Sequence, residues 1–200
     1  SLLIQGKLIA QGTATENIVF TSHRSSPVSR DWTGIVFYDS ADDNSVIGYC
    51  KISYAYGAIY CISSSPTISN NTIVHYGGSG YGILLENGSN STVANNKITG
   101  SSVGNGVRIN GSSPKITNNR IETFGTGLSI QSNGSALTPT NTNVTGNTVI
   151  NNASYAVYIY GTGNDTTNPR PTITKNALVS SNTTNVFYTT SFGSASTVVI

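Results

Sequence analysis

Charged residues are scarce in this chain. Only 9% of its 200 residues are Asp, Glu, Lys or Arg, whereas about a quarter is usual for a soluble domain. The formal net charge of +2 gives no electrostatic basis for binding nucleic acid. Apolar runs are also short, and none approaches the roughly 20 residues of a membrane-spanning helix. We therefore expect no nucleic-acid partner and no membrane span in this segment.

Cysteine, methionine and histidine are rare or missing. The two cysteines, Cys50 and Cys61, are too few for a disulfide scaffold, and we expect buried free thiols. His23 and His75 have no Cys or His partner at the spacing of a metal site, which predicts surface residues. The chain has no Met and opens in the apolar stretch SLLIQGKLIAQG. We interpret it as a piece of a longer protein that has lost any targeting signal.

In place of charge, the sequence uses Asn, Ser, Thr and Gly, which are typical of turns and neutral polar surfaces. Nine Asn-x-Ser/Thr sequons occur. Such acceptors of N-linked glycans suit an extracellular or cell-surface protein. The candidate glycosylation sites are Asn70, Asn87, Asn90, Asn110, Asn133, Asn143, Asn152, Asn164 and Asn182.

One stretch of ten residues occurs nearly twice, as SSPTISNNTI at residues 64–73 and as SSPKITNNRI at residues 112–121. Both contain an apolar residue, then Asn three positions later, then a second apolar residue two positions after that. Further copies follow the same pattern, with Cys50 in the Asn position of an earlier one, and successive copies start 21, 25, 23, 28 and 29 residues apart. The copies begin at Ile47, Ile68, Val93, Ile116, Val144 and Ile173.

A period in the twenties is the sequence signature of a solenoid. Within each repeat the apolar residues are two apart, which predicts strands and not helices. A second apolar pair follows each copy, from Ile59 and Cys61 in the first to Val186 and Tyr188 in the last. Three short strands with turns fill about 20 residues, one coil of a parallel β-helix with strands about 4.8 Å apart. The crossover rule favours a right-handed coil.

The Asn position predicts a ladder inside this coil. A sharp bend between two strands needs a residue that tolerates the left-handed region, and Asn does so best after Gly. Stacked at the coil repeat, Asn amides can bond one another along the axis. We expect a buried ladder with left-handed backbone at Asn71, Asn96, Asn119, Asn147 and Asn176.

The pattern P-x-I-x-N-N-x-I, followed by G-I/V-x-I/L, resembles the right-handed parallel β-helix repeat superfamily, which includes pectate lyases, polygalacturonases and mannuronan epimerases. The resemblance covers about residues 47–188, and the stretches GKLIAQGTATENIVFTS and DWTGIVFYDS are similar to the opening coils of secreted members. It implies an all-β fold, with residues 1–200 as a single parallel β-helix domain. We expect this domain to be a segment of a longer extracellular protein or filament subunit.

The resemblance also implies where a site would lie. In the enzymes of this superfamily the saccharide groove usually follows the outer face of the first sheet. Two insertions, at residues 132–143 and 161–171, should form a wall beside that sheet. The outward positions are Val36, Tyr60, Leu84, Arg108, Ser129, Tyr158 and Phe187, with Tyr38, Glu86, Asn110, Gln131 and Tyr160 beyond them.

Uronate lyases and epimerases need a base, a cation that neutralises the carboxylate, and a proton donor. Arg108 and Glu86, one coil apart, are the one opposite-charge pair on this face and the first catalytic candidates, with Tyr60 or Tyr158 beside them. The alternative is a surface ion pair beside exposed aromatics. A glycosidase is disfavoured, because it needs two carboxyls flanking one bond. Substrate-binding candidates are Tyr38, Asn110, Gln131 and Tyr160.

The sequence predicts no cofactor, and one acidic cluster is a weak candidate for Ca²⁺. The stretch DSADDN supplies several hard oxygens within one turn, as Ca²⁺ prefers. It lacks the spacing of a known calcium loop, so a solvated turn is the favoured interpretation. The candidate ligands are Asp39, Asp42 and Asp43.

Two hypotheses of function follow. The first is a structural or adhesive module on a cell surface, whose ends, SLLI and VVI, meet further domains or other copies, because solenoid ends need capping. The second is a polysaccharide-processing enzyme or a carbohydrate-binding module that uses the first-sheet groove. The expected partners are therefore a polysaccharide, or neighbouring copies or domains at the helix ends.

Overall fold

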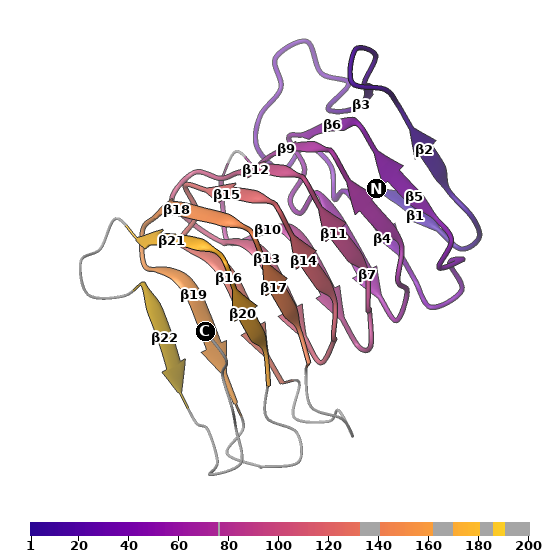
Figure 1. Cartoon of the computed structure of the whole chain (residues 1–200). Coiled ribbons are helices and arrows are strands. Elements are labelled where there is room, and N and C mark those ends of the chain that lie inside the picture. Colours follow the sequence, from indigo (N-terminus) through magenta and orange to yellow (C-terminus); the bar gives the residue numbers. More distant parts are fainter. Residues whose placement is uncertain (76, 133–140, 162–169, 181–185, 191–200) are drawn as a thin grey trace.

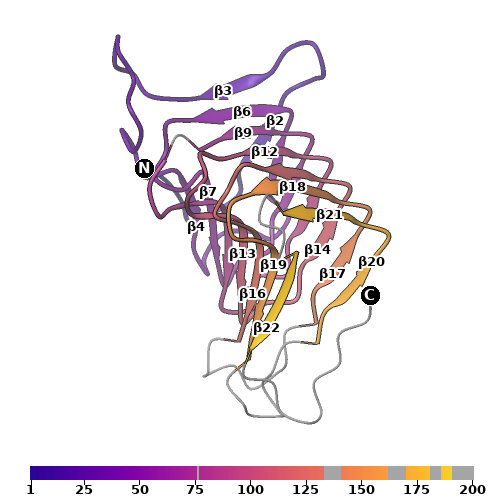
Figure 2. The same cartoon turned by 90° about the vertical axis from the view of Figure 1, so that its left-hand side faces the viewer.

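A computed structural model of the chain describes residues 1–75, 77–132, 141–161, 170–180 and 186–190. Within these ranges the chain folds into strands that belong to three parallel sheets (Figures 1 and 2). Successive strands visit the three sheets in turn, so three strands make one coil and each coil stacks on the one before it. The described residues include no helix, and therefore none that could cross a membrane.

The three sheets are named A, B and C in the order in which the chain enters them. Sheet A contains β1 (Leu2–Ile4), β4 (Ile35–Phe37), β7 (Ile59–Ile62), β10 (Tyr81–Glu86), β13 (Asn105–Asn110), β16 (Thr126–Gln131), β19 (Tyr155–Tyr160) and β22 (Phe187–Thr190). Sheet B contains β2 (Ile9–Gln11), β5 (Val46–Gly48), β8 (Thr67–Ser69), β11 (Thr92–Ala94), β14 (Lys115–Thr117), β17 (Asn143–Thr145) and β20 (Thr172–Thr174). Sheet C contains β3 (Ile18–Phe20), β6 (Cys50–Ser53), β9 (Thr72–Val74), β12 (Lys97–Thr99), β15 (Arg120–Glu122), β18 (Thr148–Asn152) and β21 (Ala177–Ser180).

The strand register confirms the repeat that the sequence predicts. The first apolar residue of each copy lies beside the first apolar residue of the next, in one column of sheet B. The fold is therefore the expected all-β, right-handed parallel β-helix. The column is Ile47, Ile68, Val93, Ile116, Val144 and Ile173.

The core is built from such columns of inward-facing side chains. Ile68, Val93 and Ile116 are 0% exposed, as are Ile98 and Ile121 in the matching column of sheet C. Fully burying one such side chain contributes about 1.5–3 kcal/mol relative to its exposure to water. Cys50 and Cys61 belong to the same core and are both free, as expected.

The asparagine ladder is present between sheets B and C. The backbone N–H of Asn96 and its side-chain Nδ2 both donate to Oδ1 of Asn119, each at 2.9 Å, and Nδ2 also donates to the carbonyl of Ile68 at 2.9 Å. Asn71 and Asn147 make the same bonds to the ladder residue of the coil that follows. Each Asn amide thus satisfies backbone groups on both sides of the turn.

The backbone conformation expected for the ladder is wrong by one position. Asn118, one residue before the ladder residue, has a φ of 54°, and Asn70 and Asn95 have φ of 59° and 57°. The described residues with positive φ do not include Asn119. The preceding residue makes the left-handed bend, which leaves the ladder residue free to point its amide inward. This explains the paired asparagines of three copies, whereas Gly146 and Lys175 take the bend position in the last two.

A second ladder runs along the outside of the turn between sheets A and B. The Asn90 N–H donates to Oγ of Ser65 at 2.9 Å, and the Ser113 N–H donates to Oδ1 of Asn90 at 2.7 Å. Asp43 and Asn141 extend the row at its two ends, through bonds of 2.6 and 2.9 Å. Here each coil donates to the coil before it, whereas the bonds from one ladder Asn to the next run to the coil after it, beside the Nδ2 bonds to carbonyls of the coil before.

The last described strand differs from the sequence prediction. The sequence pattern predicts Phe187 to point outward, between the apolar pair Val186 and Tyr188, which would then face the core. The register instead places Phe187 beside the buried Val157, and Tyr188 beside the outward Tyr158. The larger apolar ring of Phe187 packs against the core, and Tyr188 is 41% exposed.

The prediction for His75 is also wrong. It is 1% exposed and its ring stacks on Phe124, with ring centres 6.1 Å apart. Most of the two insertions, and the segment that ends in VVI, lie outside the described residues, at 133–140, 162–169 and 191–200.

Replacing Asn119 with Leu is expected to lower the free energy of unfolding by about 1–3 kcal/mol, because backbone and amide partners lose their bonds while buried. Denaturant titration measures this loss. The matched control is Asn118→Gly, which keeps the left-handed bend and removes a side chain outside the ladder. An equal loss in both variants would contradict the importance of the ladder.

Candidate functional site

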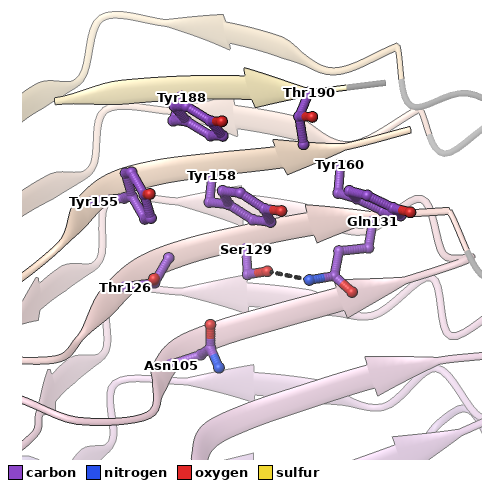
Figure 3. Close-up of a pocket in the computed structure, with 9 residues that line it drawn as sticks. All are labelled: Asn105, Thr126, Ser129, Gln131, Tyr155, Tyr158, Tyr160, Tyr188 and Thr190. Carbon is purple, nitrogen blue, oxygen red and sulfur yellow. Dashed lines mark hydrogen bonds between the residues drawn. The ribbon is translucent and has the colours of Figure 1, made fainter. Parts of the chain in front are cut away.

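The outer face of sheet A carries a hollow near the expected groove. A hollow of about 510 Å³ lies over β13, β16, β19 and β22 (Figure 3). Its lining is neutral and combines aromatic rings with hydroxyl and amide groups. The lining residues are Asn105, Thr126, Ser129, Gln131, Tyr155, Tyr158, Tyr160, Tyr188 and Thr190.

The strand register places these side chains side by side. β16 and β19 pair so that Ser129 lies beside Tyr158 and Gln131 beside Tyr160. Because side chains alternate between the two faces of a strand, all four point outward while their neighbours Ile130 and Ile159 fill the core. The hollow is therefore a direct product of the repeat.

Three tyrosines form an aromatic cluster at one side of the hollow. The rings of Tyr158 and Tyr188 stack with centres 5.7 Å apart and planes 5° apart, and Tyr155 lies 5.4 and 5.1 Å from them. Burial and the neighbouring tyrosines raise the pKa of Tyr158, so this phenol stays protonated at neutral pH. Sequence reasoning identified Tyr158 and missed Tyr155, which opens β19, and Tyr188.

The floor beside the tyrosines is a chain of neutral hydrogen-bonding groups. Gln131 Nε2 donates to the hydroxyl of Ser129 at 3.0 Å, and Gln131 Oε1 accepts from Nη2 of Arg108 at 3.1 Å. Ser129 is 1% exposed, and its hydroxyl holds the side-chain amide of Gln131 through this bond. Gln131, expected to bind substrate, is thus placed by the strand and by Arg108.

The expected pair of Arg108 and Glu86 is not formed. Arg108 Nη1 donates to the phenol oxygen of Tyr81 at 2.9 Å, and its guanidinium lies 5.5 Å from the centre of that ring. Glu86 instead accepts from Nδ2 of Asn110 at 3.2 Å. In the sheet register Arg108 lies beside Leu84 and Ser129, whereas Glu86 lies beside Asn110. Glu86 is therefore only a diagonal neighbour of Arg108, and its side chain bonds to Asn110 instead.

Tyr60 and Tyr38 lie away from the hollow. Tyr60 contacts Tyr81 edge-on, with ring centres 6.3 Å apart, and is four strand spacings, about 19 Å, from Tyr158 in the sheet. Burial raises the pKa of Tyr60 to about 12, with smaller contributions from Tyr56, Tyr81 and Glu86. Tyr38 is exposed and follows β4, near the other end of the sheet. The structure does not bring the four catalytic candidates together.

Two carboxylates of the acidic turn accept hydrogen bonds from neighbouring residues. Asp42 accepts from the backbone N–H and Nδ2 of Asn44, at 2.8 and 2.9 Å, and these bonds lower its pKa. Asp43 accepts from the N–H of Ser65 in the outer ladder. Among the described residues no three His, Cys, Asp or Glu side chains converge. Asp39, Asp42 and Asp43 are therefore not gathered as the calcium hypothesis requires.

The sequons differ in accessibility. Asn152 is 0% exposed and its Oδ1 accepts from the N–H of Phe124 at 2.9 Å, so the folded chain cannot carry a glycan there. Asn133, Asn164 and Asn182 lie outside the described residues. The remaining candidates are the exposed Asn87, Asn90 and Asn143 and the half-buried Asn70 and Asn110.

Comparison with known proteins identifies the fold. Residues 11–178 match the family model described as a right-handed beta helix region. No curated protein and no solved structure gives a match.

Tyr60 should be the last of the tyrosines on this part of sheet A to ionise. In an NMR titration of ring-labelled tyrosine, we expect one resonance with a pKa near 12 that disappears in Tyr60→Phe. The reason is burial, which disfavours the charged phenolate. The matched control is Tyr38→Phe, which removes an exposed ring. Loss of the high-pKa resonance in the control, and not in Tyr60→Phe, would contradict the assignment.

Proposed function

Because the chain belongs to the right-handed β-helix family, a fold that does not fix function, we propose a function from the site itself: a non-catalytic saccharide-binding module of an extracellular adhesive rod. The observation that carries the proposal is the stacked tyrosine cluster beside a neutral floor of hydroxyl and amide groups. The exposed sequons support the extracellular location.

The chemistry of the hollow suits a sugar chain. A pyranose ring has apolar C–H faces and a rim of hydroxyls. Tyr158 and Tyr188 offer aromatic faces that can cover the former, because aromatic rings bury large apolar area while their hydroxyls keep polar contacts. Gln131, Asn105 and Thr190 offer donors and acceptors for the latter. Such a combination of aromatic walls and a few polar groups is typical of small-ligand sites.

The same lining disfavours hydrolysis. A glycosidase needs two carboxyl groups across the scissile bond, and the described residues that line the hollow include none. Tyr158 does not supply a base, because its pKa is raised and the phenol keeps its proton. The described lining therefore offers hydrogen-bonding and aromatic groups for binding, and no carboxylate base.

Arg108 favours a second candidate, the recognition or processing of acidic saccharides. Its guanidinium contacts the neutral Tyr81 and Gln131, and within the described part of the chain no carboxylate lies at ion-pair distance from it. Its charge is thus available to a uronate carboxylate at the edge of the hollow. This is the feature that the uronate lyase or epimerase hypothesis uses.

Binding is tested by calorimetry against a panel of neutral and acidic oligosaccharides. We expect Tyr158→Ala to weaken binding about tenfold or more, equivalent to about 1.4 kcal/mol, because a stacking face is lost. The matched control is Tyr38→Ala, which removes an exposed tyrosine from the same sheet outside the hollow. Binding that is unchanged in Tyr158→Ala, or absent across the panel, would contradict the proposal.

The variant Arg108→Ala distinguishes a neutral ligand from an acidic one. If the ligand is acidic, Arg108→Ala should weaken its binding and leave neutral oligosaccharides unaffected, while the melting temperature changes little. Ultraviolet absorbance of an unsaturated product, lost in the same variant, would identify a lyase and overturn the non-catalytic proposal. Equal binding of acidic ligands by wild type and variant would exclude a role for Arg108.

A further inference from the structure

A loop of residues 21–31 follows β3 (Figure 1). One carboxylate, that of Asp31, holds this loop together. Asp31 accepts from Oγ of Ser22 at 2.6 Å and from the N–H of Val28 at 3.0 Å, and it pairs with Arg24 at 3.3 Å. These bonds lower the pKa of Asp31, first through Ser22. The loop therefore keeps its own shape at pH values well above the range in which Asp31 gains a proton.

The loop starts at Thr21, whose hydroxyl lies 2.9 Å from that of Ser53 in β6, and its far part contacts the glycine turn of Gly77 and Gly78, two coils further along. Ser29 Oγ donates to the carbonyl of Gly77 at 3.0 Å. The Arg30 guanidinium packs directly on Gly78, in the space where any other residue would place its Cβ, and lies 5.1 Å from the ring centre of Tyr56. Both glycines have positive φ, 132° and 90°.

His75 lies on the inner side of the same turn. Its Nε2 is 3.3 Å from the carbonyl of Gly78, an acceptor, so Nε2 carries the proton of the neutral ring. Its Nδ1 is buried and has no hydrogen-bond partner among the residues that the structure describes. The ring stacks on Phe124 and contacts Gly80. The glycine turn is thus held between a buried imidazole and the loop.

We propose that His75 is a pH-sensitive latch: its protonation opens the glycine turn and releases the loop of residues 21–31. The proposal does not depend on saccharide binding, since none of the residues that carry it lines the hollow.

The geometry makes the protonated ring costly in two ways. Protonation turns Nδ1 into a buried donor without an acceptor. It also places a positive charge in a buried site, where the charged group that acts on it is Arg30, a cation, beyond Gly78. The phenol ring of Tyr56 lies against Arg30, and Phe124 is apolar.

The direction of the pH effect follows from these costs. Burial, and to a smaller extent Arg30, lower the pKa of His75 below its ordinary value of 6.5, whereas the bond to Gly78 opposes this. The released state binds the proton more tightly than the latched state. The latch is therefore strongest above pH 6.5 and weakens as the pH falls from there toward the lowered pKa.

Release can be followed with a nitroxide label on Ser26→Cys, since Ser26 is exposed in the loop and both native cysteines are buried. Between about pH 8 and about pH 5, where an ordinary histidine titrates, the mobile fraction of the label should rise. A label on Ser40→Cys, an exposed site in another turn, should show no change. A loop label whose mobility ignores pH would overturn the proposal.

The two histidines provide a matched pair of variants. His75→Gln keeps a side-chain N–H that can reach Gly78 and cannot be protonated, so the transition should disappear. His23→Gln changes the exposed histidine within the loop, and the transition should stay. The reverse result would assign the effect to His23 and overturn the latch. If His75→Gln does not fold, Ser29→Ala decides: loss of its bond to Gly77 should move the midpoint to higher pH, and an unchanged midpoint would contradict the proposal.

Discussion

Parallel pairing between coils is the constraint on which the rest of this molecule depends. Each strand is three to six residues long, far too short to be stable alone, and its backbone groups find partners in the coils on either side. The pairing holds only while equivalent residues stay in register. The two ladders fix that register at two corners: Asn96 donates forward to Asn119, whereas Asn90 accepts from Ser113 of the following coil. A slipped coil would lose bonds at both.

The candidate site is a consequence of the same register. A residue that points outward in one coil lies beside the outward residue of the next, so neighbouring coils build a continuous surface from residues 20 or more positions apart. Ser129 and Tyr158 meet in this way, and Tyr158 meets Tyr188 one coil later. The scarcity of charge also acts here, because neutral side chains can be stacked in columns without like-charge repulsion.

Much of the fold could be predicted because its columns are written directly in the sequence. The interval from apolar residue to Asn to apolar residue locates the core and the ladder, as Asn119 shows. Two kinds of contact could not be predicted from the sequence: those between diagonal neighbours in a sheet, and those that depend on which of two adjacent side chains enters the core. Arg108 turns to Tyr81 and not to Glu86, and Phe187, not Tyr188, fills the last described coil. His75 is buried because Phe124, two coils away, offers it a stacking partner.

The position of the two ladders at different corners of the coil has a mechanical consequence. The hydrogen bonds of the three sheets and of both ladders cross between the same neighbouring coils, so a force that pulls along the stacking axis loads them together and not one after another. The bonds at Asn119 and at Asn90 lie at different corners of the coil, and a twist that tilts one coil against the next strains both. Parallel loading of this kind makes a stiff element from weak bonds, and stiffness along one axis is the property that a rod under tension needs.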